Sequence, residues 1–142
     1  MKHQFEVGLE WQDGRNGTGQ LKTMQLETAV SIPREMNGPN VGTNPDEMLI
    51  GAASTCFTIS FATLLENAQL TPNYLKVRSV GTVDVTGHVY TFEQIVHYVE
   101  LAFDGLYKEE RIERLARKAE ETCMISKALK GNVEVRVELN IR

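Results

Sequence analysis

The chain has 142 residues and a net charge of −4, with 42% hydrophobic and 24% charged residues, a composition ordinary for a soluble globular protein. This length is enough for one domain with a real core and leaves little room for a second, so we predict a single domain over residues 1–142. The net negative charge gives no electrostatic reason to expect nucleic acid or an anionic membrane as a partner.

The compartment follows from what the sequence lacks. The N-terminus has no apolar core of a signal peptide, and residues 48–65 carry too many hydroxyl groups for a convincing transmembrane span. We therefore expect a cytoplasmic protein that does not bind membranes. In the cytosol, we expect Cys56 and Cys123 to be free thiols rather than a permanent disulfide. Such thiols can be redox-active. The three histidines are scattered and no C-x-x-C motif occurs, so no metal site is predicted.

The N-terminal third reads as strands joined by turns. Residues 5–11 alternate between apolar and polar side chains, residues 13–17 form a glycine-containing turn, and residues 20–32 look extended again. We predict an antiparallel meander of two or three strands. Residues 33–43 are rich in Pro, Gly and Asn and predict a loop.

A long helix is predicted over residues 44–70. Asn44 is a suitable N-cap, Pro45 fits the first helical position, and Asp46 and Glu47 face the positive end of the helix dipole. Glu47 is also placed to complete a capping box. From residue 48 to residue 65 the side chains are apolar or small and uncharged, apart from five hydroxyl groups. Such a helix is expected to be covered on nearly all sides.

The rest of the chain alternates between strand and helix patterns. In order, we predict two strands joined by a hairpin turn, an amphipathic helix, a short turn of helix and a final strand, at residues 75–85, 89–103, 107–122, 125–129 and 133–141. Cys123 continues the buried stripe of the amphipathic helix. The order predicts an α+β fold in which antiparallel sheets surround a long buried helix.

Cys56 lies in the middle of the long helix, where its own helix N-terminus cannot stabilise a thiolate. Taken alone, Cys56 and Cys123 are both explained as small buried apolar side chains. A reactive thiolate needs a nearby cation or hydrogen-bond donor, because burial alone raises the thiol pKa. Arg15 and Arg34 lie in turns or loops and are the candidate cations, although each is equally explained as a solvated loop residue.

Two carboxylates could hold such an arginine in place. Asp46 and Glu47 have a structural role at the helix start, but either one could orient the guanidinium group. Asp46 and Cys56 are ten residues apart, which is about 15 Å along a straight helix. If both contact one arginine, we expect either a homodimer, in which each subunit supplies one of them, or a broken helix.

Two motifs resemble the OsmC/Ohr family of thiol-dependent peroxidases. The segment G-T-N-P-D-E-M-L-I-G-A-A-S-T-C-F (42–57) is similar to the family signature T-N-P-E-x-L…A-A…A-C-F, and C-M-I-S-K-A-L (123–129) is similar to C-P-x-S-x-x-L. The turn G-R-N-G (14–17) and the loop 33–42 resemble further parts of the family. Two departures are Asp46 in place of glutamate and Met124 in place of proline.

The resemblance implies a fold and a mechanism. The fold is an intertwined α+β homodimer with two long central helices and active sites at the subunit interface. Cys56 is implied as the peroxidatic cysteine and Cys123 as the resolving cysteine. The implied activity is reduction of organic hydroperoxides, with a dithiol such as a lipoylated protein as reductant and without metal, haem or nucleotide.

We therefore predict a hydroperoxide reductase in which Arg15, or as second choice Arg34, activates Cys56 and Asp46 or Glu47 orients the arginine. Cys56 is oxidised to a sulfenic acid and then forms a disulfide with Cys123. Two alternatives remain: a non-catalytic dimeric protein that binds an apolar ligand, and a redox sensor that uses the same disulfide.

Overall fold

The protein's structure is a computed structural model that describes every residue, Met1–Arg142, and contains two compact units. The N-terminal unit is Met1–Met48 and the C-terminal unit is Leu49–Arg142. The first unit contains β1 (Gly8–Gln12), η1 (Gly14–Asn16), β2 (Thr18–Lys22), β3 (Glu27–Val30) and η2 (Arg34–Met36), where η marks a 3-10 helix. Helix α1 (Pro45–Asn67) begins there and continues into the second unit, which adds β4 (Tyr74–Thr86), β5 (Val89–Ala102), α2 (Glu109–Thr122), α3 (Met124–Leu129) and β6 (Glu134–Ile141).

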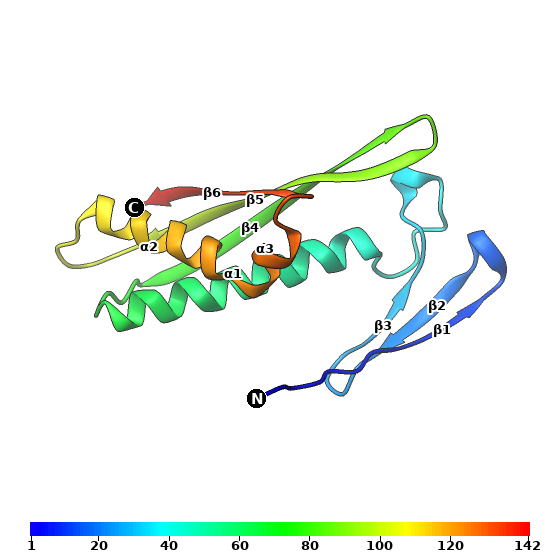
Figure 1. Cartoon of the computed structure of the whole chain (residues 1–142), viewed down its shortest axis with the longest axis horizontal. Helices are drawn as coiled ribbons and strands as arrows, with labels where there is room; N and C mark the ends of the chain where they lie inside the picture. Colours follow the sequence, from blue (N-terminus) through cyan, green and yellow to red (C-terminus); the bar gives the residue numbers. More distant parts are fainter. The chain divides into compact units, whose positions relative to one another are not determined.

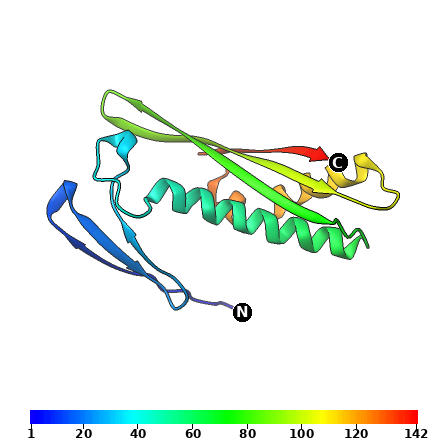
Figure 2. The same cartoon turned by 180° about the vertical axis from the view of Figure 1, so that it is seen from behind.

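The N-terminal unit is built on the predicted antiparallel meander. Strands β1, β2 and β3 pair in sequence order, with Leu21 opposite Leu9 on one side and opposite Thr28 on the other (Figure 2). The turn between β1 and β2 is η1, entered through Asp13 and Gly14 at φ values of 72° and 63°. The predicted loop after β3 contains one turn of 3-10 helix, η2.

Helix α1 begins as the sequence predicts. The Asn44 side chain accepts a hydrogen bond of 2.9 Å from the backbone N–H of Glu47, which satisfies one of the free donors of the first turn. The prediction that Glu47 completes a capping box is wrong. Its carboxylate accepts a hydrogen bond of 2.8 Å from the Thr43 hydroxyl and not from the backbone N–H of Asn44. The helix is unbroken to Asn67, which removes the broken-helix alternative.

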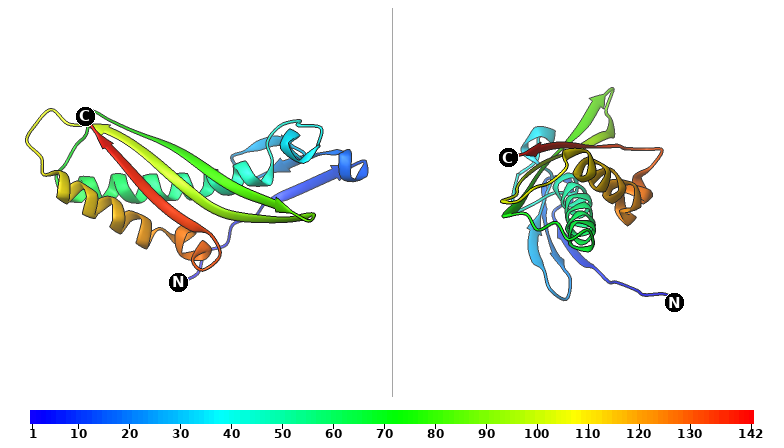
Figure 3. Two further views of the ribbon diagram at one scale, coloured as in Figure 1. Left: turned by 90° about the horizontal axis from the view of Figure 1, so that it is seen from above. Right: turned by 90° about the vertical axis from the view of Figure 1, so that its left-hand side faces the viewer.

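The C-terminal unit is a three-stranded sheet, ordered β4-β5-β6, with α1 and α2 side by side on one face (Figures 1 and 3). Strands β4 and β5 form the predicted hairpin, and both turn residues, Gly87 and His88, have positive φ. The predicted antiparallel arrangement is wrong for β6, which pairs parallel to β5. The chain crosses over through α2 and α3 between these two strands, and such a crossover returns it in the same direction.

One hydrophobic core joins the two long helices to the sheet. It consists of side chains from α1, β5 and α2: Phe57, Phe61, Leu65, Val99, Leu101, Ile112, Ala116 and Ala119. The α1 members recur every four residues, and the α2 members recur every three or four. The predicted buried stripe of the amphipathic helix is therefore confirmed.

The opposite face of α1 is exposed in the single chain, so the predicted burial of this helix on nearly all sides stays a prediction that depends on a second copy of the chain. Ile59 is 63% exposed, and Ala52, Thr55, Ala62 and Thr63 are exposed beside it. One three-stranded sheet and one neighbouring helix contact only one side of a helix this long. By length and composition alone, with a mean hydropathy of 1.8, α1 could cross a membrane, a property that core helices of soluble proteins share.

Candidate active site

The structure brings the two cysteines together. Cys56 lies in α1 directly before the core residue Phe57 and is half-buried, whereas Cys123 is fully buried at the junction of α2 and α3. Both are free thiols, and their side chains share a hydrogen bond. Two cysteines from distant parts of the sequence therefore form one candidate redox site.

The surroundings of the pair shift the pKa values of the two thiols in opposite directions. Burial raises the pKa of Cys56, but hydrogen bonds from Cys123, from the backbone N–H groups of Ile125 and Met124 and from the Ser60 hydroxyl outweigh burial and leave the pKa below its ordinary value. Burial and the hydrogen bond with Cys56 together raise the pKa of Cys123. Cys56 is therefore the thiol that deprotonates more readily, and Cys123 keeps its proton to a higher pH.

The donors around Cys56 are the part of the site that the sequence analysis missed. An arginine was the expected partner because Cys56 lies far from the N-terminus of its own helix. The structure instead places the first turn of a different helix, α3, against the sulfur. Only the Ser60 hydroxyl had a signal in the sequence, since a residue four positions after Cys56 lies on the same face of a helix.

Both candidate arginines lie in the N-terminal unit, where the Arg15 side chain contacts the turn that contains Arg34. Arg15 donates hydrogen bonds of 2.8 Å to the Met36 carbonyl oxygen and 3.4 Å to that of Asn37. Its guanidinium group therefore holds the η2 turn, whose first residue is Arg34. Neither arginine forms an ion pair with a carboxylate. That one of them serves Cys56 stays a prediction.

The candidate carboxylates occupy the first turn of α1, also in the N-terminal unit. The Glu47 carboxylate accepts a hydrogen bond from the Thr43 hydroxyl. Asp46 is half-buried and makes no side-chain hydrogen bond or ion pair. Asp46 is therefore the freer of the two to orient an arginine. No group of three His, Cys, Asp or Glu side chains is arranged to hold a metal ion.

Comparisons with known proteins identify the family of the chain. Residues 38–138 match the model of the family described as OsmC-like protein. The uncharacterized protein YmaD of Bacillus subtilis is 41% identical over 143 residues, which cover 99% of this chain and 95% of YmaD. The organic hydroperoxide resistance protein of Xanthomonas axonopodis pv. citri is 29% identical over 129 residues, covering 89% of this chain and 87% of that protein.

A solved structure shows the same fold. The OsmC-like protein of unknown function from Vibrio cholerae superposes with a TM-score of 0.83 at 15% identity, covering 98% of this chain and all of that one. The family match spans most of the chain, from the loop before α1 to β6, and includes both cysteines. The chain is thus a member of the OsmC-like protein family.

Proposed function

We propose that this protein is a thiol-dependent peroxidase that reduces organic hydroperoxides in the cytoplasm. The observation that carries the proposal is the contact between Cys56 and Cys123, with the pKa lowered at the first thiol and raised at the second. A peroxidase of this kind needs one thiolate to attack and one nearby thiol to resolve the product. Relatives named organic hydroperoxide resistance proteins support the substrate class.

The proposed cycle has three balanced steps. The Cys56 thiolate attacks the terminal oxygen of the hydroperoxide, the O–O bond breaks, and the alkoxide leaves as an alcohol after taking a proton, so that Cys56 becomes a sulfenic acid. The Cys123 sulfur then attacks the Cys56 sulfur, which forms the disulfide and releases water. An external dithiol, such as a lipoylated protein, reduces the disulfide by thiol exchange and is itself oxidised. No cofactor is required.

The charged candidates have supporting roles in this proposal. Arg15, with Arg34 as second choice, polarises the hydroperoxide and stabilises the thiolate, and Asp46 or Glu47 orients the guanidinium group. Because Asp46 lies ten residues before Cys56 on one unbroken helix, we propose that the carboxylate and the cysteine of one site come from two copies of the chain. The exposed apolar face of α1 around Ile59 supports a homodimer, since a second copy would cover it.

Intact-mass spectrometry tests the proposal directly. The reduced protein is treated with one equivalent of cumene hydroperoxide, in parallel with the Cys123→Ser variant. We expect the wild type to lose two hydrogens and the variant to gain one oxygen. No mass change in either sample, with both thiols still free, would reject the peroxidase and favour a protein that binds an apolar ligand. A disulfide without repeated turnover in excess dihydrolipoamide would instead indicate a redox sensor.

A further inference from the structure

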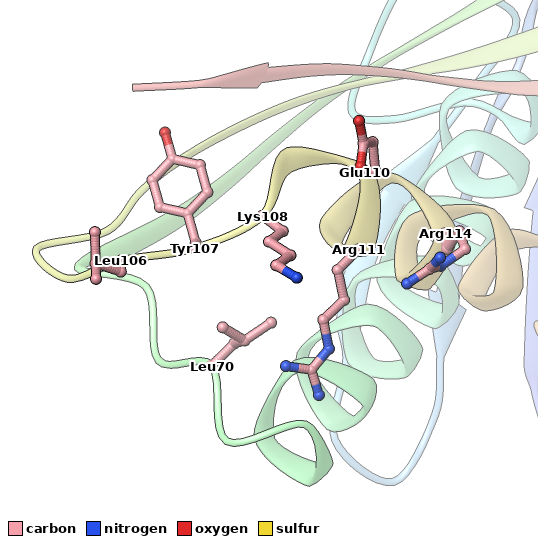
Figure 4. A pocket seen from close by; sticks show the side chains of 7 residues that line it. All are labelled: Leu70, Leu106, Tyr107, Lys108, Glu110, Arg111 and Arg114. Carbon is pink, nitrogen blue, oxygen red and sulfur yellow. The ribbon is translucent and has the colours of Figure 1, made fainter.

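Ser126 is a buried polar residue that has no role in the cycle proposed above. It lies in α3, three residues after Cys123, and is 5% exposed. Its Oγ is one of two buried side-chain atoms without a hydrogen-bond partner, the other being Nε2 of His97. A buried hydroxyl of this kind costs free energy, because it has lost water without gaining a partner. By contrast, the cavity at the start of α2 is lined almost entirely by exposed side chains, which water solvates (Figure 4).

The Ser126 hydroxyl lies beside the sulfur of Cys123. Cys123 occupies the N-cap position of α3, and the backbone N–H groups of Ile125 and Ser126 are directed at its sulfur. Together with the Ser126 hydroxyl, these donors lower the pKa of the Cys123 thiol against the larger opposing effects of burial and of Cys56. No charged side chain adds to these effects. Ser126 is therefore the one side chain that favours ionisation of Cys123.

The protonation state of Cys123 explains why this hydroxyl is unpaired. In the reduced protein the Cys123 thiol donates its hydrogen bond to Cys56, and a protonated thiol is only a weak acceptor for Ser126. A thiolate at the same position would be a strong acceptor, because hydrogen bonds to ionised groups are shorter and stronger than neutral ones. The Ser126 hydroxyl is thus held ready for the ionised form of Cys123.

The second step of the proposed cycle requires this ionised form. Cys123 gives up its proton, and its thiolate attacks the sulfur of the Cys56 sulfenic acid. The S–S bond forms, the S–O bond breaks, and the departing hydroxide takes up a proton and leaves as water. At this stage Cys56 is no longer a thiolate, so burial remains as the main obstacle to ionisation of Cys123. The Ser126 hydroxyl keeps its own proton throughout.

We propose that Ser126 is a catalytic residue of the disulfide-forming step, in which its hydroxyl donates a hydrogen bond to the Cys123 thiolate as this attacks Cys56. The inference rests on the proposed peroxidase function and adds to it a side chain that acts only after the hydroperoxide has been reduced. Ser126 should therefore affect resolution of the sulfenic acid and not its formation.

The first test does not depend on peroxidase activity. In the Cys56→Ser background Cys123 is the only cysteine, and its pKa is measured from the pH dependence of the ¹³Cβ chemical shift of labelled cysteine. Ser126→Ala should raise this pKa by about 1, because a donor to the thiolate is lost. Thr122→Val is the matched control and should leave the pKa unchanged, since the Thr122 hydroxyl donates to the Lys118 carbonyl oxygen.

A stability measurement separates this role from a structural one. Because the Ser126 hydroxyl has no partner in the reduced protein, Ser126→Ala should leave the midpoint of urea unfolding unchanged or raise it. A hydroxyl that held α3 in place would instead lower the midpoint when removed.

The second test follows a single turnover with both cysteines present. Reduced protein is mixed with one equivalent of cumene hydroperoxide at pH 7, quenched with acid at increasing times and analysed by intact-mass spectrometry. Ser126→Ala should gain the oxygen as fast as the wild type and then form the disulfide about three-fold more slowly. The thiolate fraction falls about ten-fold, but a thiolate of higher pKa is a better nucleophile and offsets part of the loss. The difference should shrink as the pH rises toward the pKa of Cys123.

The outcomes separate this inference from the function on which it rests. If neither protein gains oxygen, the peroxidase is rejected and the catalytic role of Ser126 with it. If the wild type completes the cycle but Ser126→Ala changes neither the pKa of Cys123 nor the rate of disulfide formation, the role of Ser126 is overturned and the peroxidase stands. An equal effect of Thr122→Val, or a lowered urea midpoint with slowing that is the same at every pH, would likewise overturn it.

Discussion

His97 offers a quantitative test of the packing around the candidate site. It lies on β5 with no exposed surface, and its ring stacks on Phe57, the neighbour of Cys56, at 4.9 Å between ring centres. Its Nδ1 is 2.6 Å from the Ser79 hydroxyl, which in turn donates to the Ser54 hydroxyl at 2.9 Å, while Nε2 has no partner. Protonation of Nε2 would bury a cation without an acceptor, and burial accordingly lowers the pKa of His97 to about 4.

The sign of the pH effect follows from this depressed pKa. Between pH 6.5 and 4 the unfolded chain binds a proton at this position that the folded chain excludes, so the free energy of unfolding falls as the pH falls through this range. At 1.36 kcal/mol per pKa unit, a shift from 6.5 to about 4 corresponds to a loss of about 3 kcal/mol. This loss should be complete below the folded-state pKa.

The assay is urea unfolding, followed by circular dichroism at pH values from 4 to 8 and at one protein concentration. His97→Asn removes the titrating group, so the wild type should lose about 3 kcal/mol more stability than the variant between pH 7 and pH 4. His88→Asn is the matched control, since His88 is an exposed turn residue at φ 65°, a conformation that asparagine tolerates. Parallel stability curves for the wild type and His97→Asn would refute the reasoning.

Three further predictions address the thiol site, the helix start and the core. Met124→Pro removes the N–H donor to Cys56 without straining the chain, because the preceding residue already has ψ 125°, and proline suits the first position of a helix. The pKa of Cys56, measured from the pH dependence of alkylation by iodoacetamide, should rise relative to Met124→Ala, and equal values would exclude this donor. Asn44→Ala removes the cap of α1 and should cost about 1 kcal/mol in urea unfolding, whereas an unchanged midpoint would show that the cap contributes nothing. Phe61→Ala leaves a cavity in the core and should cost about 3–5 kcal/mol in the same assay, with a loss below 1 kcal/mol arguing against this packing.

The features that the sequence predicted correctly are those governed by local rules. The N-cap at Asn44, the alternation in β6 and the buried stripe of α2 depend on residues within one or two turns or strand repeats of each other. The family motifs around Cys56 and Cys123 are local as well, which is why they pointed to the cysteine pair before any contact was known.

Tertiary structure alone decided how these elements face one another. The sequence does not specify that the first turn of α3 meets the middle of α1, so the backbone N–H groups of Met124 and Ile125 were not recognised as donors to Cys56. The parallel pairing of β6 with β5 and the burial of His97 were missed for the same reason. Each depends on contacts between distant segments, where burial and register are set by the whole fold and leave no periodic signal in the chain.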